Sequence, residues 1–96
     1  MKKVIVYARV SSNSIDALNA QVEQCIEYAN SIGVTVTEVI KHIGTSSNGS
    51  AFKDILDDIT TDVIVTDTTR IARNKTIQNE VIQQLNNKNC KIICIN

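Results

Sequence analysis

Val4-Ile5-Val6-Tyr7-Ala8 is an apolar, mostly β-branched run near the start of the chain, and it shows no clean alternation of apolar and polar residues. Such a run is typical of a strand that is buried on both faces of a parallel sheet. From Ile15 onward, apolar residues recur every three or four positions, which predicts a helix whose buried face holds Leu18, Val22, Ile26 and Ala29. Gly33 is well placed to end that helix. The chain therefore opens with a strand followed by a helix.

The same succession of strand and helix continues to residue 96. Residues 34–40 alternate apolar and polar positions and predict a half-exposed edge strand, and residues 44–50 have the small polar composition of a mobile loop. Ser50 can cap a short helix, which leads to a buried strand at 63–65, a helix at about 77–85 and a core strand at 92–95. The order βαβαβαβ predicts an α/β fold: an open, mostly parallel four-stranded sheet with helices on both faces, of flavodoxin-like topology.

Composition limits the classes of function. With 96 residues, of which 43% are hydrophobic, the chain is expected to form one domain, and a formal net charge of zero confines any phosphate binding to a local site. The three cysteines form no CxxC pair and His42 has no second metal ligand nearby, so we expect reduced core cysteines and neither metal nor cofactor. The N-terminus is too short in apolar length for a signal peptide or a membrane span, which predicts a cytoplasmic protein.

All three arginines follow predicted strands: Arg9 follows the first, and Arg70 and Arg73 follow the third. Arginine carries a planar, permanently charged fork that grips phosphate through two parallel hydrogen bonds. Because the carboxyl ends of parallel strands meet at one edge of a sheet, we expect these guanidinium groups and Ser11 to share a rim. Arg9 should point to the same side as Ser11. Arg70 and Arg73 should share one face of a helical turn, with the two residues between them turned to the core.

Three guanidinium groups around one serine hydroxyl would stabilise a phosphodiester under attack by that serine. The same groups could simply hold a phosphate, cap helices or pair with carboxylates. Ser12, Asn13 or Ser14 could likewise do no more than cap the helix that begins near Ile15. The residues alone leave phosphoryl transfer and plain phosphate binding both open.

Tyr7-Ala8-Arg9-Val10-Ser11-Ser12 resembles the Y-x-R-V-S-S/T segment that opens the catalytic domain of serine site-specific recombinases, the resolvase/invertase family. Leu18-Asn19-Ala20-Gln21 is similar to that family's L-x-x-Q on its first helix. Residues 64–73 resemble the apolar strand that runs into L/V-D-R-L-x-R. The resemblance spans the whole chain and implies a resolvase-like sheet.

In that family the motif serine attacks a DNA phosphodiester, forms a 5′-phosphoserine bond and frees a 3′-hydroxyl, and the reverse attack by a partner strand reseals the DNA without metal or nucleotide cofactor. The resemblance therefore implies that Ser11 is the nucleophile. It implies that the phosphate is neutralised by Arg9, Arg70 and Arg73, and that the site is supported by Tyr7, Gln21 and Asp67.

The resemblance also implies partners and a domain boundary. Double-stranded DNA would be the substrate, and the full-length protein would be a homodimer or tetramer. Residues 1–96 would be one catalytic domain that stops before the family's dimerisation helix and DNA-binding region. Such a piece should bind DNA weakly, because most phosphate and base contacts lie elsewhere.

The chain departs from the family pattern at two positions. Thr69 stands where the family has an acidic residue before the first arginine of its second motif, and Gly49 stands where it usually has an arginine. Asp67 lies two residues before Thr69, roughly 6.5 Å away in an extended strand, which predicts that it is too far to substitute without backbone rearrangement. The family's S-G pair survives at best as Ile43-Gly44 or Thr45-Ser46. These departures leave the catalytic activity of the chain open.

Three other readings remain. A catalytically silent, recombinase-like module would bind protein or DNA, and a receiver-like or other flavodoxin-like domain would hold phosphate or flavin at the same rim. The receiver version lacks the acidic pair that should end its first strand. A serine hydrolase would depend on His42, which could equally be a surface residue at a strand end or a base. Three acidic residues, Asp57, Asp58 and Asp62, are expected at a solvated helix end and not in a metal site.

Overall fold

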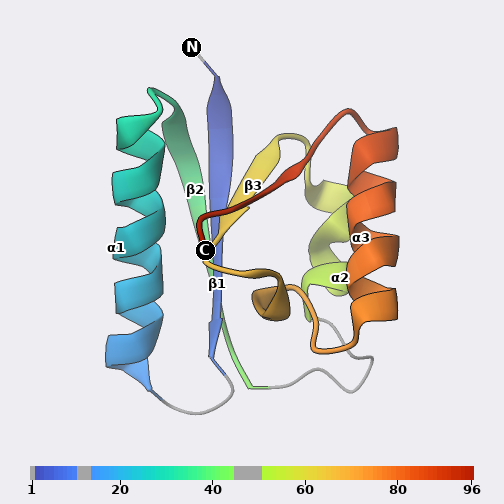
Figure 1. The fold of residues 1–96 in the computed structure, drawn as a ribbon, viewed down its shortest axis with the longest axis horizontal. Coiled ribbons are helices and arrows are strands. Elements are labelled where there is room, and N and C mark those ends of the chain that lie inside the picture. The colour runs from blue at the N-terminus through green and yellow to red at the C-terminus, as the bar shows by residue number, and fades with distance from the viewer. Residues whose placement is uncertain (1, 11–13, 45–50) are drawn as a thin grey trace.

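The computed structural model describes residues 2–10, 14–44 and 51–96 (Figure 1). In chain order the elements are β1 (Lys3–Val10), α1 (Ile15–Ser31), β2 (Thr35–Ile43), α2 (Ala51–Ile55), the 3₁₀ turn η1 (Leu56–Asp58), β3 (Asp62–Val65), the 3₁₀ turn η2 (Thr68–Arg70), α3 (Lys75–Asn87) and β4 (Ile92–Cys94). The four strands form one sheet in the order β2-β1-β3-β4, and each neighbouring pair is parallel. The predicted α/β fold class is confirmed.

Strand β1 is buried on both faces, as its continuous apolar run predicts. Val4 and Val6 pack with Cys25 and Ala29 of α1 on one face. On the opposite face Tyr7 belongs to a second apolar cluster, which α2 and α3 help to form. Figure 1 shows α1 on one side of the sheet and α2 and α3 on the other. Burial of each such side chain stabilises the fold by about 1.5–3 kcal/mol relative to exposure, so the two helix layers hold β1 in place.

The strand order changes direction beside the carboxyl end of β1. The chain leaves β1 through α1 to reach β2 on one side, and it returns through α2 to β3 on the other side. The segments that follow β1 and β3 therefore diverge, and in open α/β sheets ligands bind at this point of divergence. Arg9 lies at the end of β1, and Arg70 ends the 3₁₀ turn that follows β3.

Two strands are longer than their apolar runs predicted. Strand β1 extends to Val10 and β2 extends to Ile43, because Arg9 pairs with His42 and Val10 pairs with Ile43 in the same ladder. The prediction of a half-exposed edge strand is confirmed for β2. Gly33 has the positive φ of +76° that its predicted role after α1 requires.

The end of the chain differs more from expectation. Strand β4 covers three residues and is partly exposed, so it is not the buried core strand that its apolar run suggested. Cys90 is buried before β4 begins, whereas Cys94 is exposed, so the two cysteines do not pack together on one strand face. Burial and the nearby Asp67 carboxylate raise the pKa of the Cys94 thiol.

Asp62 corrects one expectation about the acidic residues. Asp57 and Asp58 are exposed as expected, but Asp62 begins β3 and its side chain is only 6% exposed. Its carboxylate lies 2.6 Å from Lys2 Nζ and accepts a hydrogen bond from the Lys91 main-chain N–H at 3.0 Å. Asp62 is therefore a buried anchor between the start of β3 and the approach to β4.

Neither a membrane-crossing helix nor a metal-binding cluster is present in the described part of the chain. Its helices are too short or too polar to cross a membrane. No three side chains among its His, Cys, Asp and Glu residues are grouped to hold a metal ion.

Candidate active site

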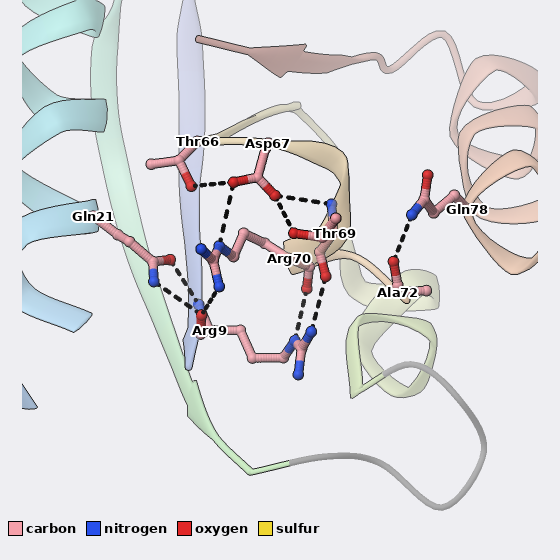
Figure 2. Close-up of polar contacts among 8 residues, drawn as sticks. All are labelled: Arg9, Gln21, Thr66, Asp67, Thr69, Arg70, Ala72 and Gln78. Carbon is pink, nitrogen blue, oxygen red and sulfur yellow. Dashed lines mark hydrogen bonds and ion pairs between the residues drawn. The ribbon is translucent and has the colours of Figure 1, made fainter. Parts of the chain in front are cut away.

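Arg9 lies at the centre of a hydrogen-bond network at the carboxyl end of β1. The residue is only 7% exposed, and its guanidinium donates to three main-chain carbonyls. Nε donates to Arg70 at 3.1 Å, Nη2 donates to Thr69 at 2.8 Å, and Nη1 donates to Gly44 at 3.3 Å. Figure 2 shows the first two of these contacts. One side chain thereby ties β1 to the end of β2 and to the turn after β3.

Gln21 completes the backbone bonding of Arg9 from α1. Strand β3 pairs with β1 only as far as Val6, whereas β1 continues to Val10. Gln21 Oε1 accepts the Arg9 main-chain N–H at 3.2 Å, and Gln21 Nε2 donates to the Arg9 carbonyl at 3.0 Å (Figure 2). Because a buried, unpaired main-chain group costs about 1–3 kcal/mol, the buried Gln21 amide allows β1 to extend past its strand partner.

Arg70 reaches back to Arg9. Its Nη1 donates to the Arg9 carbonyl at 3.1 Å, while the Arg70 carbonyl accepts from Arg9 Nε, so each arginine binds the other's main chain. Arg70 Nε is buried and has no hydrogen-bond partner among the described residues. It lies 3.6 Å from Asp67 Oδ2, which is an ion-pair distance. The buried Nε–H of Arg70 is therefore held by the Asp67 charge and not by a hydrogen bond.

Asp67 reaches Arg70 because the backbone after β3 turns and is not extended. The turn η2 brings residues three apart close together, so Asp67 and Arg70 form an ion pair (Figure 2). Asp67 Oδ1 also accepts the Thr69 N–H at 3.0 Å and contacts the Thr69 hydroxyl. Thr69 therefore helps to hold the carboxylate that serves Arg70, although it supplies none itself.

Arg73 is separate from this network. The helical turn ends at Arg70, and the Arg73 side chain is exposed and has no hydrogen bond or ion pair within the described ranges. Ile71 and Ala72 are buried, as predicted. Gln78 Nε2 donates to the Ala72 carbonyl at 2.6 Å, a contact that the sequence did not reveal (Figure 2). Arg70 and Arg73 therefore do not share one face of a helical turn as expected: Arg70 is part of the network, and Arg73 lies at the surface outside it.

Tyr7 joins the end of β1 to the end of β2. Its ring is fully buried and stands edge-on to Phe52 and His42, at centroid distances of 4.9 and 5.3 Å. Its hydroxyl lies 2.9 Å from His42 Nδ1. Burial raises the pKa of Tyr7 to about 12, although the positive charge of Arg9 opposes that rise. His42, for which the sequence left a surface role and a role as a base both open, lies near the end of β2 as the hydrogen-bond partner of Tyr7.

Several predicted site residues lie outside the described part of the chain. They are Ser11, Ser12, Asn13, Gly49, Ser50 and the pair Thr45-Ser46. Ser14 is the N-cap of α1, and its side chain makes no capping hydrogen bond. The described site therefore consists of the arginines and the residues that hold them.

The fold and the site define an α/β domain with two arginines bound to each other's main chain where the segments that follow β1 and β3 diverge. The model of the resolvase N-terminal domain family matches residues 4–96. The chain belongs to this family of serine recombinase catalytic domains. It is thus a recombinase domain, from a class of enzymes that carry out site-specific recombination.

Several solved structures have the same fold. A resolvase family site-specific recombinase from Streptococcus pneumoniae superposes with a TM-score of 0.83 at 24% identity, over 99% of this chain and 72% of that one. The first open reading frame of transposon ISC1904 from Sulfolobus solfataricus gives 0.78 at 30% identity, over 98% and 67%. The N-terminal catalytic domain of TP901-1 integrase gives 0.78 at 24% identity, over 98% and 77%. No curated protein sequence is similar enough to match this chain.

Proposed function

We propose that Ser11 is the nucleophile of a DNA strand-exchange reaction. Its Oγ forms a bond to the scissile phosphorus as the bond from phosphorus to the 3′-oxygen breaks. The products are a 5′-phosphoserine linkage and a free 3′-hydroxyl. Attack by a partner strand's 3′-hydroxyl reverses both bond changes, so no metal or nucleotide is consumed. Double-stranded DNA is the substrate, and at least two copies act together because two duplexes exchange strands.

The observation that carries this proposal is the pairing of Arg9 with Arg70. Each binds the other's carbonyl, so both arginine side chains lie at the same edge of the sheet, and Ser11 lies two residues beyond Arg9. Arg70 is partly exposed, and its hydrogen bond to Arg9 uses only one of its five N–H donors, so donors remain that a phosphate oxygen can accept from. Negative charge accumulates on phosphoryl oxygens during transfer, and one well-placed donor typically contributes about 10²- to 10³-fold in rate.

In this proposal one further residue contacts DNA, and three others position the arginines or brace their strand. Arg73 is exposed and meets the DNA backbone next to the scissile phosphate. Gln21 fixes the main chain of Arg9, and Asp67 orients Arg70 through their ion pair. Tyr7 braces the end of β1 against β2 through its hydroxyl. Because the chain has no net charge, DNA affinity should come from the arginine rim and should fall with salt in proportion to a few phosphate contacts.

One observation supports a second candidate function, that of a silent module which binds DNA without cleaving it. Arg9 already donates to three carbonyls, and Thr69 provides no carboxylate at its position. A guanidinium has five N–H donors, so about two remain free on Arg9. Under this reading the arginine pair stabilises the sheet edge and supplies positive charge, and no covalent bond to DNA forms.

A covalent trap separates the two functions. The probe is a pool of duplexes with a randomised centre and 3′-bridging phosphorothiolate linkages, whose 3′-thiol leaves readily and reattacks poorly. The chain is incubated with the pool, and denaturing gels and peptide mass spectrometry then detect DNA-linked protein. We expect an adduct at Ser11 that Ser11→Ala abolishes and Ser12→Ala retains. No adduct with the wild-type chain would support the silent module, and an adduct at Ser12 or Ser14 would refute the assigned nucleophile.

A further inference from the structure

His42 occupies the place on β2 that faces the site arginine. It is the sole histidine of the sequence, and it pairs in register with Arg9 of β1. Side chains of paired residues on neighbouring parallel strands project from the same face of the sheet. Tyr7, two residues before Arg9, is on the face that α2 and α3 cover. His42 and Arg9 therefore stand side by side on that face, at the carboxyl end of both strands.

The Tyr7 contact engages one ring nitrogen of His42 and leaves the other for a ligand. The Tyr7 hydroxyl lies 2.9 Å from His42 Nδ1, and because burial raises the pKa of Tyr7 to about 12, the phenol keeps its proton near neutral pH and can donate it to Nδ1. A neutral imidazole that accepts at Nδ1 carries its own proton on Nε2. Nε2 lies on the side of the ring away from Tyr7 and has no hydrogen bond within the described residues. Because Tyr7 is fully buried and His42 is partly exposed, that side is the one a ligand reaches.

We propose that His42 is a further catalytic residue of this site, whose Nε2–H donates to an oxygen of the scissile phosphate beside Arg9. This assignment rests on the proposed phosphoryl transfer. An imidazole whose Nδ1 accepts from Tyr7 offers an N–H donor at this edge of the sheet without adding a third positive charge beside Arg9 and Arg70. The Tyr7 hydroxyl keeps the donor directed outward, so Tyr7 is the positioning residue for His42.

Two substitutions of His42 test the roles of its two ring nitrogens separately. Asn places an oxygen where Nδ1 stands and can still accept from Tyr7, but it has no group at the Nε2 position. Gln reaches the Nε2 position with an N–H donor. With the phosphorothiolate duplex pool, we expect His42→Asn to slow adduct formation about 10²-fold and His42→Gln to stay within about tenfold of wild type. The exposed α1 residue Gln24 gives the control Gln24→Asn, which should leave the rate unchanged.

Thermal unfolding of each variant shows whether a slow rate reflects lost folding. The proposal is overturned if His42→Asn reacts at the wild-type rate, or if His42→Gln is as slow as His42→Asn while both remain folded. If the wild-type chain itself forms no adduct, the proposed phosphoryl transfer fails instead, and the role of His42 is then decided by its binding of phosphate.

Nuclear magnetic resonance tests that binding without any reaction. ¹⁵N-histidine labelling reports on His42 alone, because the chain has one histidine. Long-range ¹H–¹⁵N spectra should show the proton on Nε2, and inorganic phosphate should shift the Nε2 resonance in a saturable way. Sodium chloride at equal ionic strength should not do so. A proton on Nδ1, or an Nε2 resonance that phosphate moves no more than chloride does, would overturn the proposal.

Discussion

Replacing Gln21 with leucine should destabilise the fold by removing the polar partner of Arg9. Gln21 is 8% exposed, and leucine has a similar volume, so the packing change is small. The Arg9 main-chain N–H loses its acceptor at 3.2 Å and is left buried, which costs about 1–3 kcal/mol. The Arg9 carbonyl loses Gln21 but keeps Arg70 Nη1 at 3.1 Å, so its loss is smaller. We therefore expect Gln21→Leu to lower the free energy of unfolding by about 2 kcal/mol.

Urea unfolding followed by circular dichroism measures this change, and Gln24→Leu on the exposed side of α1 is the matched control. For a domain of this size, about 2 kcal/mol corresponds to a fall in melting temperature of roughly 8–16 °C. The control should stay within about 0.5 kcal/mol of wild type. Amide hydrogen exchange should speed up at Arg9 in particular. Equal stability of the two variants, or unchanged protection of the Arg9 amide, would refute the view that Gln21 replaces a strand partner.

Three further outcomes follow from the same contacts. Arg9→Lys keeps the positive charge but not the planar guanidinium, so it can donate to at most one or two of the three carbonyls. We expect about 10²-fold slower adduct formation and a measurable loss of stability in urea. A rate equal to wild type would show that the guanidinium geometry is not used. Asp62→Ala removes a buried acceptor and should lower the free energy of unfolding by about 2–3 kcal/mol, as measured in urea. Asp62→Asn keeps the Lys91 contact and should lower it by only about 1 kcal/mol, because the ion pair that is lost involves the half-exposed Lys2. The free energy of unfolding should fall between about pH 10 and 12, because the unfolded chain releases the Tyr7 proton near its ordinary pKa of 10.0 while the folded chain holds it to about 12. Tyr7→Phe should reduce the pH dependence of the free energy of unfolding in that range. The same pH dependence in this variant and in wild type would contradict the burial of the phenol.

The elements of the fold could be predicted from sequence because burial dictates the pattern that defines them. A strand covered on both faces must be apolar throughout, as in residues 4–8, and a helix covered on one side must repeat its apolar residues every three or four positions, as in α1. The ends of strands were less predictable. Strand β2 continues through Lys41 and His42 because β1 offers them a ladder, and no local pattern encodes that partner.

The residues of the site were predictable as types, but their contacts were not. Arg9 and Arg70 are 61 residues apart, and Tyr7 and His42 are 35 apart, so their hydrogen bonds depend on strand order. The role of Asp67 depends on a single 3₁₀ turn. An extended chain would place its carboxylate beyond reach, whereas η2 brings it to Arg70. A turn of three residues leaves no periodicity from which it could be predicted.

The three carbonyls that hold Arg9 do not by themselves exclude it from phosphate chemistry. They are neutral acceptors, and a hydrogen bond from guanidinium to an anionic phosphate oxygen is roughly twice as strong as a neutral one. Arg9 is only 7% exposed, so most of the free-energy cost of removing its charge from water arises on folding, before DNA binds. A phosphate oxygen can therefore replace one carbonyl as the acceptor of an Arg9 N–H, while the other two carbonyls keep the side chain oriented. On this view the network of Arg9, Gln21 and Arg70 supports a reactive site before DNA binds, and β1, which carries Arg9, ends at Val10, directly before Ser11.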